Sequence, residues 1–211
     1  ILNKLQAANF NTVFFQIRGM SDAMYHSHYE PWSQYLSSVR GADPGWDPLA
    51  YLVEEAHARG IEVHAWLNPY RYSTSAESHG NLPDDYAVAH PEWLLDYGNY
   101  TKILNPGLPE VRQRISDVVA DIITNYDVDG IVFDDYFYVQ GITDDMDEEQ
   151  YQLYNPEGLS RKDWRRNNVN HMVRDVQTRI NTIKPYITFG ISPAGLAASS
   201  LVVAAKYAVD H

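Results

Sequence analysis

Two adjacent carboxylates, Asp134 and Asp135, stand where the apolar segment Ile131 to Phe133 comes to an end. A carboxylate that opens into a cavity can act as a nucleophile or as a general acid or base. Successive side chains of a strand point to opposite faces, so we expect one of the two to face the cavity and the other the helices or the loop. Because both faces are apolar, the pattern leaves open which one faces inward. The alternative is structural: a strand-end aspartate that caps loop amides or pairs with an arginine.

Polar side chains end the other apolar segments in the same way. The first segment, 12–18, contributes Gln16 and Arg18, and the last ends in Ser192. The other candidates for contacts with a substrate are His64, Trp66, Asn68, Tyr70, Arg71, Asn105, Tyr136 and Tyr138. Arg18 or Arg71 would keep a nearby carboxylate ionised. Tyrosine and tryptophan combine an apolar face with a polar tip, which suits the stacking of sugar rings.

Metal and thiol chemistry are weakly supported. His26 and His28 have a spacing that can bind a metal ion, and with His64 and Asp134 they define an alternative, metal-dependent site. The acidic segment 144–149 lacks the regular spacing of an EF-hand, so we interpret it as a solvated loop. The chain has no cysteine and no Gly-x-Ser-x-Gly motif, which excludes a thiolate nucleophile and disfavours a serine one. We expect no metal and no cofactor.

Composition bounds the partners. The 211 residues are 45% hydrophobic and 21% charged, as in ordinary globular proteins. Subtracting 28 acidic from 16 basic residues gives a net charge of -12, which suits neither nucleic acids nor anionic membrane surfaces. Since no apolar run approaches about 20 residues, no membrane-spanning segment is expected.

The elements that position these residues alternate between helix and strand. Buried strands are predicted at 12–18, 61–67, 131–135 and 186–191, and a hairpin around Gly98 and Asn99. Helices are predicted from Pro48, capped by Asp47, from Pro109, and from Ser160, which forms a capping box with Asp163. Apolar strands that alternate with amphipathic helices indicate a parallel sheet covered by helices.

Two α/β architectures fit this alternation: an open doubly wound sheet and a (β/α)₈ TIM barrel. Loops after the predicted strands are long and polar, and loops before them are short, which favours a barrel whose site lies at the carboxyl ends of the strands. No Gly-rich phosphate motif follows any strand. We therefore predict a single domain over residues 1–211, an incomplete barrel of about four to five βα units. Because Ile1 begins directly on a helix, we expect a trimmed piece of a longer protein.

Six strings carry a family resemblance: FQIRG (15–19), HAWLNPYR (64–71), LNPGLPEVR (104–112), YDVDGIVFDDYFY (126–138), DWRRNNVN (163–170) and FGISPAG (189–195). The chain resembles the bacterial glycosyl-hydrolase-like family ten, formerly a domain of unknown function. The resemblance implies a (β/α)₈ barrel, secreted or lipid-anchored members, and cleavage of peptidoglycan glycan strands by some of them. It also implies that Asp134 is the nucleophile of the fourth barrel strand.

The chain departs from related patterns at three positions. Val132 stands where the family often has a polar residue, commonly histidine, so one hydrogen bond to the site is expected to be missing. Ser192 stands where related clans have a glutamate as the general acid, so that role falls to Asp135, a loop carboxylate or a residue beyond His211. Tyr136 replaces the last acidic residue of the chitinase strand motif, which argues against substrate-assisted chitinase chemistry.

The preferred hypothesis is a glycoside hydrolase that uses carboxylates on a bacterial cell-wall or related polysaccharide, located outside the cytoplasm. The first alternative is a barrel that binds glycans without catalysis. The second is the metal-dependent hydrolase described above.

Overall fold

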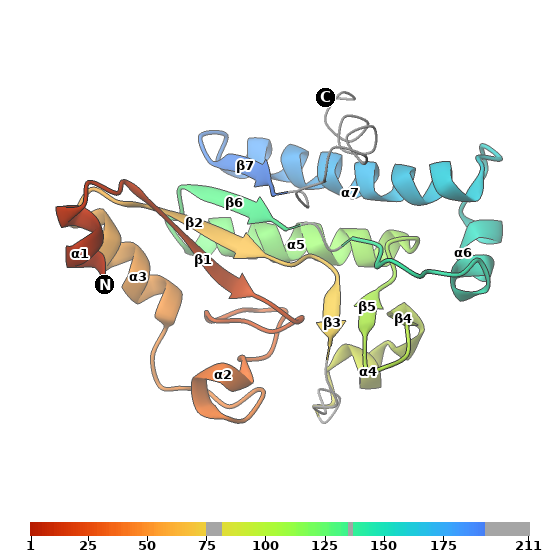
Figure 1. Cartoon of the computed structure of the whole chain (residues 1–211), viewed down its shortest axis with the longest axis horizontal. Coiled ribbons are helices and arrows are strands. Elements are labelled where there is room, and N and C mark those ends of the chain that lie inside the picture. Colours follow the sequence, from red (N-terminus) through yellow and green to blue (C-terminus); the bar gives the residue numbers. More distant parts are fainter. Residues whose placement is uncertain (75–81, 135–136, 193–211) are drawn as a thin grey trace.

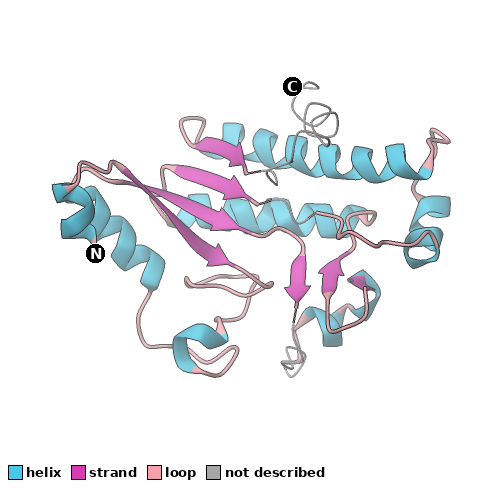
Figure 2. Ribbon diagram, viewed as in Figure 1, coloured by secondary structure: helices cyan, strands magenta, loops and turns pink. Residues whose placement is uncertain are grey.

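The computed structural model describes residues 1–74, 82–134 and 137–192. Its main sheet has four parallel strands in the order β1 (Thr12–Arg18), β2 (Glu62–Leu67), β6 (Gly130–Phe133) and β7 (Thr188–Ile191). Each strand of this sheet lies beside the next one along the chain, as Figures 1 and 2 show. A doubly wound sheet reverses its strand order at a switch point, and these four strands do not reverse.

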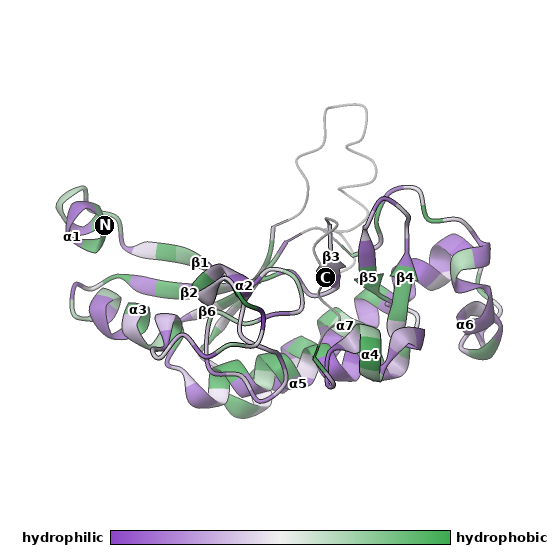
Figure 3. Cartoon of the chain, turned by 90° about the horizontal axis from the view of Figure 1, so that it is seen from below, coloured by the Kyte–Doolittle hydropathy of each residue, from purple (hydrophilic) through white to green (hydrophobic). Residues whose placement is uncertain are grey.

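Helices cover one face of the main sheet. Figure 3 shows α3 (Pro48–His57), α5 (Pro109–Asn125) and α7 (Arg161–Ile183) on the same side of the strands. The short α1 (Leu2–Ala7) precedes β1. Helices α5 and α7 pack against each other through fully buried side chains such as Val119, Met172 and Val176. This burial of apolar surface is the main stabilising contribution to the layer.

The helix boundaries follow the predicted signals. The Asp47 side chain accepts hydrogen bonds from the backbone N–H groups of Leu49 and Ala50 at the start of α3. Ser160 accepts one from the N–H of Asp163 at the start of α7, which confirms that capping pair. Gly60, with φ of +69°, allows the chain to turn after α3 into β2.

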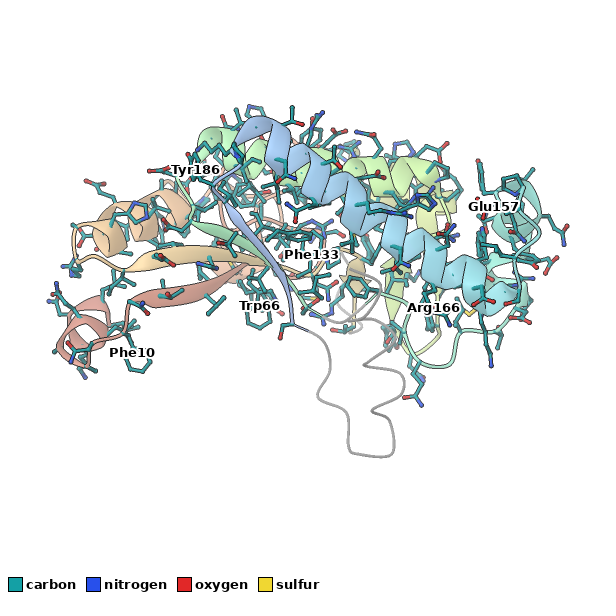
Figure 4. All side chains as sticks on the ribbon, turned by 90° about the horizontal axis from the view of Figure 1, so that it is seen from above. Phe10, Trp66, Phe133, Glu157, Arg166 and Tyr186 are labelled. Atoms are coloured by element: carbon teal, nitrogen blue, oxygen red, sulfur yellow. The ribbon has the colours of Figure 1, made fainter. Side chains whose placement is uncertain are left out.

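Helices cover one face of the main sheet, and the opposite face is open. Phe133 is fully buried toward the helices, whereas Trp66 projects from the opposite face, as Figure 4 shows. Phe14, in register with His64 of β2, is 57% exposed on that opposite face. Because paired residues of parallel strands point the same way, Val132, which pairs with Trp66, shares the open face.

Long segments follow the strands, and short ones precede them. Residues 19–47, 68–108 and 134–160 follow β1, β2 and β6, whereas only 58–61, 126–129 and 184–187 precede β2, β6 and β7. This confirms the predicted asymmetry of loop lengths.

The long segments carry small elements of their own. The predicted hairpin is β4 (Leu94–Asp96) with β5 (Lys102–Leu104), and β3 (Arg71–Ser73) completes an antiparallel sheet in the order β3-β5-β4. The remaining elements are α2 (Gln34–Ser37), α4 (Tyr86–Ala89), η1 (Pro91–Trp93), η2 (Asp145–Asp147) and α6 (Glu148–Leu153). No helix in the described ranges is long and apolar enough to cross a membrane.

Candidate active site

Asp134 is the centre of the candidate site. It follows β6 directly, and its side chain is directed by two N–H donors from the end of β2. The side-chain amide of Asn68 donates to Oδ1 at 2.8 Å, and the indole N–H of Trp66 donates to Oδ2 at 3.3 Å. An ionised carboxylate only accepts hydrogen bonds, so two N–H donors match it. Since Trp66 lies on the open face and donates to Asp134, the side chain of Asp134 is directed to that face. The alternation of side chains alone left the orientation of Asp134 open.

Asn68 is fully buried and performs two tasks. While its amide nitrogen donates to Asp134, its Oδ1 accepts hydrogen bonds from the backbone N–H groups of Tyr70 at 3.2 Å and Arg71 at 2.6 Å. Asparagine forms such turns readily because its side chain imitates a backbone carbonyl. The turn at Asn68-Pro69 therefore fixes the direction of the donor that holds Asp134.

Arg18 lies beneath this turn. It is 1% exposed, and its guanidinium binds Glu30, the hydroxyl of Ser21 and the carbonyl oxygens of Asn68 and Pro69. A β-bulge between Gln16 and Arg18 shifts the register, so Arg18 pairs with Leu67, which is buried under the helices. The bulge breaks the alternation that would put Arg18 on the face of Gln16. The structure thus places Arg18 in a buried network.

The open face carries three of the predicted residues in two layers. Gln16 and Trp66 pair in register, and His64 lies one layer below Trp66, toward the amino ends of the strands. The His64 ring packs edge to face against Phe14 at 5.1 Å and covers Gly130, its partner in β6. An added Cβ on Gly130 would lie 2.3 Å from Nδ1 of His64, so this ring fills the space that the glycine leaves.

The two predicted tyrosines that the structure describes differ in their burial. Tyr70 is fully buried and packs edge to face against Phe137 at 6.2 Å. Tyr138 is half-buried, and its hydroxyl accepts a 3.5 Å hydrogen bond from the amide of Asn168. Burial raises the pKa of Tyr70 well above its usual value of 10, and it raises the pKa of Tyr138 as well. Both hydroxyls therefore stay protonated around neutral pH.

The other predicted residues are spread over the rim and the turns. The backbone carbonyl of Arg71 accepts a hydrogen bond from Ser21. Ser192 is exposed, and its N–H extends the sheet by donating to the carbonyl of Phe133 at 2.8 Å. Asn105 is 1% exposed and caps its own Asn-Pro turn by accepting from the N–H of Gly107 at 2.9 Å. Asp135 and Tyr136 lie outside the described residues.

The metal alternative requires residues that lie apart. The ring of His28 contacts the carboxylate of Asp121 at 2.6 Å, and His26 packs beside His28. His64 contacts Glu62 and Phe14 instead. Within the described part of the chain, no group of three or more histidine, aspartate or glutamate side chains could hold a metal ion.

The acidic segment 144–149 contains a residue that contradicts its interpretation as a solvated loop. Asp147 is fully buried, and both of its oxygens accept hydrogen bonds from the guanidinium groups of Arg161 and Arg165. Arg165 also donates to the carbonyl of Thr143 at 3.0 Å. Through these hydrogen bonds the two arginines hold the segment that follows β6 against the first turns of α7.

Glu30 is the polar residue that the sequence did not identify. It sits in the segment after β1, with no motif around it, and it is 6% exposed. Its Oε1 accepts hydrogen bonds from Arg18 and from the hydroxyl of Tyr86. The sequence predicts Arg18 near the site, and a buried arginine needs a carboxylate partner. That need is the only signal in the sequence that could have pointed to Glu30.

Comparisons with known proteins bear on the family of the chain. The family model described as "Glycosyl hydrolase-like 10" matches residues 1–208. Glycosyl hydrolase YngK of Bacillus subtilis (strain 168) is 42% identical over 200 residues, which cover 93% of this chain and 39% of that protein. Glycosyl hydrolase DigH of Escherichia coli (strain K12) is 40% identical over 205 residues, which cover 92% of this chain and 46% of that protein. The chain spans less than half the length of these relatives.

Solved structures place the fold. An α-L-fucosidase isoenzyme 2 from Paenibacillus thiaminolyticus superposes with a TM-score of 0.60 at 16% identity, covering 90% of this chain and 28% of that one. An α-galactosidase from Lactobacillus brevis gives a TM-score of 0.55 at 16% identity, covering 92% and 24%. The fold is that of the glycoside hydrolase (β/α)₈ barrels, and the four parallel strands form part of such a barrel, as predicted.

Proposed function

Because the chain belongs to the glycosyl hydrolase-like 10 family, we propose that the protein hydrolyses a glycosidic bond of a bacterial cell-wall polysaccharide, with Asp134 as the attacking carboxylate. The observation that carries the proposal is the position of Asp134 at the carboxyl end of a barrel strand, on the open face, with both oxygens directed by N–H donors. Barrel enzymes build their active sites at this end of the strands.

The chemistry follows from the two hydrogen bonds. Oδ1 accepts from Asn68 at 2.8 Å and Oδ2 from Trp66 at 3.3 Å, and these two donors orient the carboxylate on the open face. In the proposed first step, a carboxylate oxygen of Asp134 attacks the anomeric carbon, the glycosidic bond breaks, and a general acid protonates the leaving oxygen. Water then hydrolyses the resulting glycosyl ester, and the acid, now a base, takes a proton from that water.

We propose that the general acid is a second carboxylate. The candidates are Asp135, a loop carboxylate and a residue beyond His211. Retention of configuration requires about 5–5.5 Å between the two carboxyl groups. Trp66, which contacts Asp134, and Gln16, which pairs with Trp66 on the neighbouring strand, are proposed to contact the sugar bound on the open face. Arg71 and Ser192, which lie after the ends of their strands, are also proposed to contact the substrate.

The cell-wall substrate and a location outside the cytoplasm are the finer parts of this proposal. They rest on the resemblance of the sequence motifs, and the acidic character of the chain is compatible with an uncharged or amino-sugar polymer. The partner proposed is an oligosaccharide or polysaccharide, with no resident metal or cofactor.

The test uses the full-length protein with defined peptidoglycan and, separately, with plant and animal glycans, followed by mass analysis of the products. Asp134→Asn is expected to lower hydrolysis by roughly 10³-fold or more while glycan binding remains, because only the nucleophile is lost. Asp129→Asn is the matched control, since Asp129 lies at the amino ends of the strands and binds the N–H of Val63 there. Binding without hydrolysis in the parent protein would instead favour the non-catalytic barrel.

A further inference from the structure

Arg18 and Glu30 form a buried ion pair next to the candidate active site. Their side chains are 1% and 0% exposed. Nε and Nη2 of Arg18 both donate to Oε1 of Glu30, at 2.8 and 2.6 Å. The hydroxyl of Tyr86, from the long segment after β2, donates to the same oxygen at 3.1 Å. Two loops that follow different strands therefore converge on one carboxylate.

The other arm of the guanidinium reaches the turn that carries Asn68. Nη1 of Arg18 donates to the carbonyl oxygen of Asn68 at 2.6 Å and to that of Pro69 at 3.1 Å. The backbone N–H of Asn68 donates in turn to the carbonyl of Arg18 at 2.8 Å. The backbone of Asn68 is thus held from both sides by Arg18, and its side chain is left to point at Oδ1 of Asp134.

We propose that Glu30 and Arg18 are positioning residues for Asp134, which act through the Asn68 turn. The inference rests on the proposed function for its catalytic consequence. A buried ion pair contributes little to stability compared with apolar residues of the same volume, so its geometry matters more than its energy. The planar guanidinium donates in two fixed directions at once, and a lysine ammonium cannot reproduce that fork. Glu30 binds Nε and Nη2 and so fixes the orientation of the guanidinium, which leaves Nη1 directed at the carbonyl oxygens of Asn68 and Pro69.

Arg18→Lys tests the positioning directly, because lysine keeps the charge balance with Glu30 but loses the two contacts with the turn. The full-length variant is expected to remain folded and to show a crystal-structure distance between Asn68 Nδ2 and Asp134 Oδ1 that exceeds 3.5 Å. Its kcat is expected to fall by about tenfold or more, while KM stays within about twofold, since no group that touches the substrate has changed. Glu30→Gln, which removes the charge but keeps the shape, is expected to act in the same direction and serves if Arg18→Lys does not fold.

Asp147→Asn is the matched control. It also alters a fully buried carboxylate that binds arginine, yet among the described residues no hydrogen bond joins Asp147 to Asn68. It should lower the melting temperature and leave both the Asn68–Asp134 distance and kcat as they are. A folded Arg18→Lys protein with an unchanged distance would overturn the inference, and so would an equal change in the control. The distance between Asn68 Nδ2 and Asp134 Oδ1 still tests the positioning role if the parent protein hydrolyses no glycan. In that case only the proposed function is wrong.

Discussion

Replacing Asn68 by alanine separates the orientation of Asp134 from the rest of the site. The change removes the amide that donates to Oδ1 of Asp134 at 2.8 Å and leaves Trp66, at 3.3 Å, as the remaining donor of the pair. It also removes the oxygen that accepts from the N–H groups of Tyr70 and Arg71. The first loss concerns catalysis and the second the stability of the turn, so the two can be measured apart.

The magnitudes follow from the number and kind of bonds. A hydrogen bond to a charged group contributes about 1.5–3 kcal/mol, which corresponds to roughly 10- to 150-fold in kcat if the bond orients the nucleophile. Each backbone N–H left unsatisfied in a buried turn costs about 1–3 kcal/mol. Tyr70 is fully buried and Arg71 is half-buried, so we expect the free energy of unfolding to fall by about 1–5 kcal/mol.

The assay compares Asn68→Ala with Asn105→Ala on the glycan that the parent protein cleaves. Asn105 is equally buried and caps an equivalent Asn-Pro turn through the N–H of Gly107, but its hydrogen bonds lie within that turn and with Trp93. Urea unfolding should show a loss of stability in both variants, whereas kcat should fall only in Asn68→Ala. Equal losses of kcat in the two variants would refute the role of the Asn68–Asp134 hydrogen bond.

Three further predictions concern stability. Asp147→Ala removes a fully buried carboxylate from two part-buried guanidinium groups, which keep Asp144 and Glu148 as partners. It should lower the free energy of unfolding by about 1.5–3 kcal/mol in urea titrations, and a loss below about 1 kcal/mol would contradict this. Gly130→Ala should cost about 1–3 kcal/mol because its Cβ would meet the ring of His64, and His64→Ala in the same chain should recover most of the loss. Burial and then two neighbouring arginines lower the pKa of His171 below 6.5, so the unfolded chain binds more protons and stability should fall as the pH drops through 6.5. An NMR titration should give a pKa of His171 below 6.5. If the free energy of unfolding of His171→Gln depends on pH as steeply as that of the parent protein, the prediction is wrong.

Local signals were sufficient for the architecture. The caps at Asp47 and Ser160 and the hairpin at Gly98 depend on neighbours along the chain, and the structure has all three. The asymmetry of loop lengths is also a property of the sequence, and it favoured a barrel over a doubly wound sheet. The third strand was predicted to extend to Asp135, but β6 ends at Phe133. Strand ends depend on how far the neighbouring strands pair, and a single segment carries little information on that.

Partners distant in sequence were harder to predict. Arg18 was expected at the site because polar residues at strand ends gather there, but a bulge of one residue turned it into the interior. Nothing in the segment 12–18 marks that bulge. Glu30 and Asp147 lie in polar loops, where most carboxylates are solvated, and only the tertiary fold shows that each of them is buried against arginine.

The pairing of Asn68 with Asp134 follows from register, which explains both why these two residues meet and why the sequence could not establish it alone. Strands β2 and β6 are parallel, and Leu67 pairs with Phe133. The next residue of each strand therefore leaves the sheet at the same height, and both side chains emerge on the face of Trp66. A shift of the register by one residue would put Leu67 beside Asp134 and remove the hydrogen bond from Asn68. The same register places His64 of β2 over Gly130 of β6, two residues before the Trp66 and Val132 pair, so the small glycine accommodates the imidazole ring in the layer below the carboxylate.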